Sequence, residues 1–219
     1  RNFQRVYDLR ERVLPDWDDS NVPSTEEMNK SLVLKSVKAM GVAKLTWISD
    51  YFRLDKTSTV TAVKQLLDEG ELIQVEVEGW DVPAIVNSSF ISELDAIEEM
   101  ISNSHITTFL SPFDPVIWDR KRALELFGFD YKIEVYTPAS KRIYGYFTLP
   151  ILYKGRIIGR IDPKAHRKDG VMEIRSLHLE SGIKIDNELI FEVGEALRSF
   201  ANWHGTPELL IKQAPFQIY

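Results

Sequence analysis

Several features that are common in proteins are missing from this chain of 219 residues. It has no cysteine, so disulfides and thiolate metal sites are excluded. No apolar run approaches the roughly 20 residues that a membrane-spanning helix needs, and no secretory signal peptide opens the chain. The apolar fraction of 44% is ordinary for a globular protein. These features predict a folded protein without a membrane partner.

The common motifs of enzyme active sites are missing too. The chain has no glycine-rich phosphate loop and no nucleophile elbow. His166 lies near Asp162 and Asp169, but their spacing fits neither one face of a helix nor one face of a strand. The other histidines are interpreted as structural: His105, His178 and His204. The sequence therefore predicts no metal site and no cofactor.

The chain does have an uneven distribution of charge. It holds 27 Lys and Arg against 33 Asp and Glu, a net charge of −6. The block from Arg120 to His178 holds 13 cations and 6 acids, a net +7, which leaves −13 for the remainder. An acidic protein that concentrates its cations in one block is expected to bind a polyanion there. The alternative, a solvated sheet face rich in Lys and Arg, stays open.

The order of elements predicts an α+β fold: a winged-helix domain, then a β-rich C-terminal domain, barrel-like or a sheet, with a packing helix. Helices are expected at about 25–40, 44–52 and 57–68, and Ser24 with Glu27 has the spacing of a capping box. Strands at about 72–77 and 83–86 form a hairpin, which completes the winged-helix order. The predicted domains are a lead-in segment at 1–24, the winged helix at 25–88, connecting helices at 89–128 and the β-rich domain at 129–219.

Three local expectations accompany this organisation. The third helix is expected to bury Val60, Val63 and Leu67. An amphipathic connecting helix is expected to carry Ile91, Leu94, Ile97 and Ile101. A C-terminal helix capped by Asp186 is expected to pack its apolar stripe on the β-rich domain, through Leu189, Val193, Leu197 and Phe200.

The predicted winged helix is poorly suited to reading DNA. The outer face of its third helix and the residue before it offer only two cations, Lys64 and Lys56. The wing carries acids that would face a polyanion: Glu71, Glu76, Glu78 and Asp81. Because DNA affinity comes largely from phosphate neutralisation, this domain is interpreted as a scaffold more than a reader.

The β-rich region offers better DNA contacts. Lys141–Tyr146 is expected to open a strand whose two tyrosines share a face, where they could stack on bases or simply fill a half-buried sheet. A basic loop at a hairpin end is expected at 159–170, and it could track a nucleic-acid backbone or be a solvated turn. The predicted DNA-binding residues are Lys141, Arg142, Tyr144, Tyr146, Arg160, Lys164, Arg167, Lys168, Lys56 and Lys64.

Six segments of the chain match a known pattern: Leu110–Asp114, Leu126–Tyr131, Glu134–Pro138, Lys141–Tyr146 and Gly159–Asp162, with Tyr7–Pro15 at the start. In these segments the sequence resembles the AlkZ/YcaQ-like DNA glycosylases. The resemblance implies tandem winged helices with a C-terminal β-domain around damaged double-stranded DNA, in a cytoplasmic, nucleoid-associated enzyme. It also implies removal of alkylated bases or unhooking of interstrand crosslinks, without a cofactor.

One departure from the family pattern affects the predicted activity. The family's catalytic motif is Gln, an apolar residue, then Gln or Asp, in the N-terminal part of the full protein. The nearest string here, Gln74–Glu76, has the wrong position and third residue. We therefore expect a DNA-binding C-terminal portion of a longer glycosylase, with no catalytic residue in this segment. The alternatives are a winged-helix transcriptional regulator with an effector-binding β-domain, and a protein-interaction module.

Overall fold

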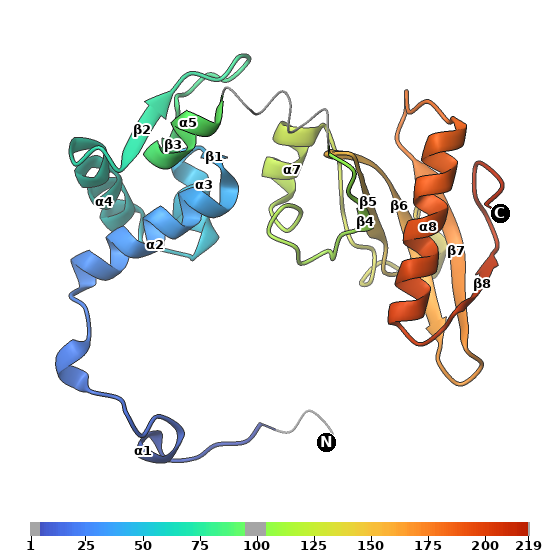
Figure 1. The fold of residues 1–219 in the computed structure, drawn as a ribbon, viewed down its shortest axis with the longest axis horizontal. Coiled ribbons are helices and arrows are strands. Elements are labelled where there is room, and N and C mark those ends of the chain that lie inside the picture. The colour runs from blue at the N-terminus through green and yellow to red at the C-terminus, as the bar shows by residue number, and fades with distance from the viewer. Residues whose placement is uncertain (1–4, 95–103, 219) are drawn as a thin grey trace. The chain divides into compact units, whose positions relative to one another are not determined.

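The computed structural model describes residues 5–94 and 104–218. The chain divides into two compact units, Arg1–Glu93 and Leu94–Tyr219. The fold class is α+β, as predicted: helices accompany a three-stranded antiparallel sheet in the first unit and a five-stranded mixed sheet in the second (Figure 1). Among the described residues, no helix is long and apolar enough to cross a membrane.

The chain through residue 94 is mainly helical. Its elements, in order, are α1 (Arg10–Val13), the 3-10 turn η1 (Asp19–Asn21), α2 (Thr25–Met40), β1 (Val42–Ala43), α3 (Leu45–Tyr51), α4 (Lys56–Asp68), β2 (Leu72–Val75), β3 (Ala84–Asn87), the 3-10 turn η2 (Ser88–Phe90) and α5 (Ile91–Leu94). The strands pair in the order β1-β3-β2. This order places β3, whose four residues are all buried, in the middle of the sheet.

The helix starts follow the sequence signals. Ser24 and Glu27 form the predicted capping box of α2, and Asp55 caps α4 by accepting from the Ser58 N–H. The buried face of α4 differs from the prediction, since Val60 is half exposed. The face that packs on α2 is shifted by one position, and it consists of Thr59, Ala62, Val63 and Leu66.

The second unit is built on one long strand pair. Its elements are β4 (Thr107–Phe109), α7 (Arg120–Phe127), the 3-10 turn η3 (Ala139–Lys141), β5 (Leu149–Tyr153), β6 (Arg156–His166), β7 (Val171–Leu179), α8 (Asn187–Trp203) and β8 (Glu208–Ile211). The strand order is β4-β5-β6-β7-β8, antiparallel except that β8 joins β7 in parallel. Ile97 and Ile101 of the predicted connecting helix lie outside the described residues.

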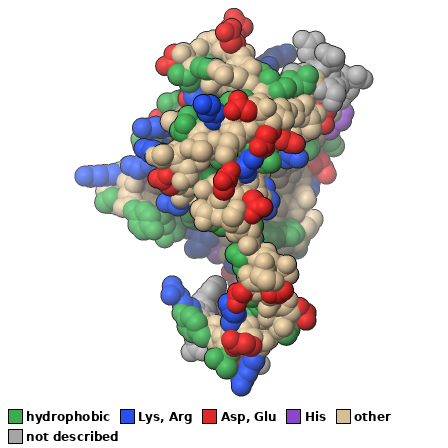
Figure 2. Space-filling model, turned by 90° about the vertical axis from the view of Figure 1, so that its left-hand side faces the viewer, with side chains coloured by type: hydrophobic (Ala, Val, Ile, Leu, Met, Phe, Trp, Pro, Cys, Tyr) green, Lys and Arg blue, Asp and Glu red, His purple; other side chains and the backbone are tan. Residues whose placement is uncertain are grey.

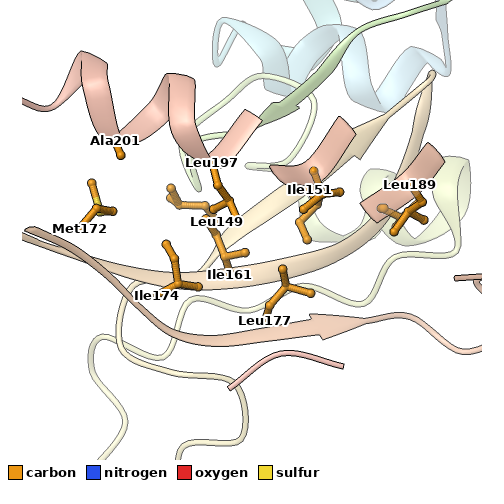
Figure 3. Packing of buried hydrophobic residues seen from close by; sticks show 11 residues of the cluster. Leu149, Ile151, Ile161, Met172, Ile174, Leu177, Leu189, Leu197 and Ala201 are labelled. Atoms are coloured by element: carbon orange, nitrogen blue, oxygen red, sulfur yellow. The ribbon is translucent and has the colours of Figure 1, made fainter. Parts of the chain in front are cut away.

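Helix α8 covers one face of this sheet. Asp186 caps it by accepting from the Leu189 N–H, as predicted. Its apolar stripe lies on side chains of β5, β6 and β7, as Figure 3 shows for Leu197 above Ile161 and its neighbours. Leu189, Val193 and Leu197 are buried. The expectation for Phe200 is met only in part, because this ring is half buried and meets Phe109 edge-on.

The opposite face of the sheet is covered by irregular chain, and we call it the loop face. Ile157 lies in a second cluster with Ile117, Phe129 and Tyr131, whereas its neighbour Ile158 belongs to the cluster beneath α8. Neighbouring residues of a strand point to opposite faces. The segment before β5 therefore packs on the loop face, which explains why most of β6 is buried.

The predicted strand at Lys141–Tyr146 is wrong. The structure has η3 at Ala139–Lys141 and irregular backbone from there to β5. The segment follows no ladder because its backbone N–H groups bond to side chains instead of a neighbouring strand. Local propensity favoured a strand, and tertiary contacts overrode it.

Candidate nucleic-acid interface

A buried carboxylate organises residues 134–146, which we call the 134–146 loop. Glu134 accepts hydrogen bonds from the backbone N–H groups of Ile143, Tyr144 and Gly145, at 2.9, 2.8 and 3.2 Å. Its side chain is buried. Three successive N–H groups that converge on one anion form a backbone nest. The nest fixes the backbone of residues 143–145.

A second buried carboxylate holds the end of this loop. Asp162 of β6 accepts from the N–H groups of Tyr146 and Phe147, at 3.1 and 3.2 Å. Gly145 lies against it with φ +143°, and a Cβ there would stand 2.4 Å from Asp162 Cγ. Only glycine combines this conformation with so close an approach. Asp162 is therefore a structural anchor of the loop.

Arg160 was predicted to contact DNA, but the structure places it inside the protein. Its side chain is only 2% exposed. The guanidinium donates to the Asp130 carbonyl at 3.0 Å and pairs with the Glu180 carboxylate. It also stacks on the ring of Tyr144, 4.0 Å from the centroid. These contacts make Arg160 a core residue without surface for a phosphate.

Tyr144 and Tyr146, which were predicted to share a face, point in different directions. Tyr144 points inward, with its ring on Arg160 and edge-on to His178, and its carbonyl accepts from Ser176 Oγ at 2.9 Å. Tyr146 points outward and is 44% exposed. The predicted alternation fails because the loop curls around Glu134 and is not extended.

Arg142 shapes the outer surface of the loop. Its Nε donates to the Thr137 carbonyl at 2.9 Å, and its guanidinium lies 4.8 Å from the centroid of the Tyr146 ring. A cation over an aromatic face is attracted by the ring quadrupole. The side chain is partly buried, so it offers DNA only part of its guanidinium.

Backbone hydrogen bonds, together with one nearby charge, keep Glu134 ionised. Burial by itself would raise the pKa of this carboxyl. The three N–H groups and the Arg142 guanidinium outweigh that effect, and the pKa is lowered from its ordinary value of 4.5. Glu134 is therefore an anion at neutral pH, and its charge is directed at the backbone.

Four predicted cations of the block are exposed: Lys141, Lys164, Arg167 and Lys168. Among the residues that the structure describes, none of the four forms an ion pair. Ala165 packs into the cluster beneath α8. Because strand neighbours alternate, Lys164 and His166 point to the loop face. Lys164 is two residues beyond Asp162, so it lies roughly 6–7 Å further along β6 than the loop's anchor.

His166 takes part in a local ion cluster. Its Nε2 lies 3.0 Å from a Glu173 carboxylate oxygen, and Arg175 Nε approaches the same oxygen at 3.5 Å. The hydrogen bond with His166, aided by Arg175, lowers the pKa of Glu173. Asp162 serves the loop instead, and the described parts of the chain contain no group of three or more His, Asp or Glu residues that could hold a metal ion.

The hairpin of the first unit exposes mainly acids, whereas the block of the second unit exposes cations. Lys56 and Lys64 are exposed on α4, but the hairpin after it exposes four acids: Glu71, Glu76, Glu78 and Asp81. Figure 2 shows Asp and Glu side chains interspersed with Lys and Arg side chains on the face that is turned to the viewer. Lys44 adds no free charge, since it lies over Trp80 and 3.6 Å from Asp81.

The family model for AlkZ-like DNA glycosylases matches residues 1–203. The chain belongs to the AlkZ-like DNA glycosylase family. The resemblance seen in the sequence is thereby confirmed, and the family implies a DNA substrate and a role in DNA repair. A comparison with solved structures found no significant match.

Three of the segments that carry the AlkZ-like resemblance meet in the second unit. Glu134–Pro138, Lys141–Tyr146 and Gly159–Asp162 supply the nest, the cation over Tyr146 and the anchor on β6. Sequence reasoning missed the role of Glu134, which nothing in its local pattern indicates. The positive φ of Gly145 was not predicted either. The available signal in the sequence was a glycine between two tyrosines.

Proposed function

We propose that this chain is the DNA-binding C-terminal portion of a glycosylase that removes alkylated bases or unhooks interstrand crosslinks from double-stranded DNA. The AlkZ-like family supports a DNA substrate. The observation that carries the proposal is the exposure of four predicted cations of the +7 block, of which Lys141 belongs to the anchored loop. Exposed cations neutralise phosphates and release counterions, which supplies sequence-independent affinity.

The proposed DNA-contacting residues are a subset of those predicted from the sequence. Lys141, Lys164, Arg167 and Lys168 would contact phosphates, and Arg142 with Tyr146 would meet the groove or an unpaired base. Lys56 and Lys64 would contribute less. Arg160 and Tyr144 are left out because their contacts lie within the protein.

The first unit fits the same proposal as a winged helix with a supporting role. Its element order, α2-β1-α3-α4-β2-β3, and its sheet order, β1-β3-β2, are those expected of this motif. In that motif α4 would be the recognition helix and the β2–β3 hairpin the wing. The exposed acids of the hairpin oppose phosphate contact, which favours a scaffold over a reader.

The salt dependence of duplex binding tests the location of the interface. Lys141→Ala with Lys164→Ala should weaken binding and flatten the plot of log K against log salt by about 0.9 per lost phosphate contact. The matched control, Lys56→Ala with Lys64→Ala, removes the same charge from α4 and should have less effect. If the control pair abolishes binding while the first pair leaves it intact, α4 is the reader and the proposal is wrong.

Base excision tests the division of labour. Residues Arg1–Tyr219 should bind duplex that contains an N7-alkylated guanine but should release no base, because the family's glutamine motif is not found among them. Without a positioned water and its proton acceptor, most of the rate enhancement is lost. Alkali-induced strand breaks above the spontaneous level would show that catalytic residues lie within this segment.

A further inference from the structure

The 134–146 loop presents an apolar side chain at its surface. Ile143 is 75% exposed, although isoleucine is among the residues most often buried. Single exposed apolar residues are common on protein surfaces. This one differs because its own N–H and those of the next two residues are held by the buried Glu134 carboxylate. The side chain therefore projects from a fixed backbone.

Residues 134–137 and 142–143 of the loop lie side by side. The Arg142 side chain bonds to the Thr137 carbonyl, and the Ile143 N–H bonds to Glu134. These contacts place the segment that holds Tyr136 beside the segment that holds Ile143. Tyr136 is 94% exposed. The resulting tip carries an aliphatic side chain and an exposed aromatic ring, with the exposed Lys141 next to Arg142 in the chain.

We propose that Ile143 is a wedge that enters the minor groove of a DNA duplex and separates two stacked base pairs, with Glu134 as the residue that positions it. The inference rests on the proposed function, because it takes duplex DNA as the ligand of this surface. Proteins that kink duplexes insert apolar side chains of this kind between base steps. The positive charge of the surrounding block matches that ligand and disfavours a basic protein partner.

The loop's rigidity suits this role. Inserting a side chain from a mobile loop costs the conformational entropy of ordering that loop. Here the nest and the Asp162 anchor have already ordered it. Lys141 can hold a phosphate beside the inserted side chain, and the Tyr136 ring offers a surface on which an unstacked base can rest.

The test uses the whole 219-residue chain and a duplex with 2-aminopurine at its centre, whose fluorescence rises when it unstacks. Binding of the unmodified protein should raise the fluorescence. Ile143→Ala should abolish that rise. It should also weaken binding by about 10- to 100-fold, because the burial of a side chain of this size in the complex is lost. The salt slope should stay unchanged, because no charge is removed. Phe191→Ala, which removes an exposed apolar side chain from α8, is the matched control and should change neither readout.

A second variant tests the positioning role. Glu134→Gln keeps Ile143 but weakens the nest, and it should lower the fluorescence rise. Combined with Ile143→Ala it should cause no further loss of affinity, since both changes act through one side chain. Additive losses of affinity would show that Glu134 affects binding independently of Ile143, and its positioning role would be overturned.

The outcomes separate the wedge from the proposed function. If duplex binding depends on salt and on Lys141 with Lys164, but Ile143→Ala binds and unstacks DNA like the unmodified protein, the wedge is overturned and the proposed function stands. If the unmodified protein shows no salt-dependent duplex binding, the proposed function fails and the wedge fails with it.

Discussion

The two units of this protein use charged side chains in opposite ways. Every charged residue that is buried in the described chain lies in the second unit: Arg122, Glu134, Arg160 and Asp162. The buried polar residues of the first unit are uncharged: Ser36, Ser49, Thr59 and Asn87. The exposed charges also differ, with acids on the hairpin of the first unit and cations on the loop face and hairpin end of the second.

This difference follows from the backbone that each unit has to satisfy. In the first unit most backbone groups pair within helices and a small sheet, so an apolar core suffices. The second unit covers one sheet face with irregular chain, whose N–H groups have no ladder. Buried carboxylates satisfy those groups. Two cations of the block, Arg122 and Arg160, are buried with them, and most of the others remain at the surface.

The largest expected effect is the loss of a buried charge from the second unit. Arg160→Ala should lower the free energy of unfolding by about 3–5 kcal/mol, because it leaves the Glu180 carboxylate and the Asp130 carbonyl without their partner. Lys30→Ala in the first unit removes the partner of Glu69 at the surface and should cost about 0–1 kcal/mol. Chemical denaturation measures both. Similar losses would remove the contrast between the units.

A smaller effect is expected from the nest, and it depends on pH. Glu134→Gln should cost about 1.5–3 kcal/mol at pH 7, as for hydrogen bonds to a charged group. The folded pKa of Glu134 is lowered from 4.5, so its ionised form stabilises the fold above that pH. This contribution is lost as pH falls through the folded pKa. Melting curves of the protein and the variant should therefore converge in acid, and a constant difference down to pH 2 would contradict the assignment.

The smallest expected effect comes from reversing the charge of the first unit's hairpin. Glu76→Lys with Glu78→Lys changes two exposed acids and should leave stability within about 0.5 kcal/mol. If these acids are what keeps the hairpin from DNA, the variant should bind duplex more tightly at low salt. Its salt slope should steepen by about 0.9 per new phosphate contact. An unchanged slope would show that the hairpin faces away from the DNA.

The sequence by itself determined the regular part of this protein. Capping residues and apolar periodicity located α2, α3, α4 and α8, because helix boundaries depend on contacts within a few residues. The cationic block was located by counting charges along the chain, which needs no three-dimensional information. The segments of family resemblance identified a family that the match over residues 1–203 confirms.

Only the tertiary structure decided which residues of the block are available at the surface. Arg160 and Lys164 are both cations of one strand, yet one is enclosed by Tyr144 and Glu180 while the other is exposed. Glu134 reaches across the loop to N–H groups 9 to 11 residues away. Such contacts are set by how the chain packs on the sheet, and no local pattern encodes them. The same packing turned a predicted strand into the loop that exposes Ile143.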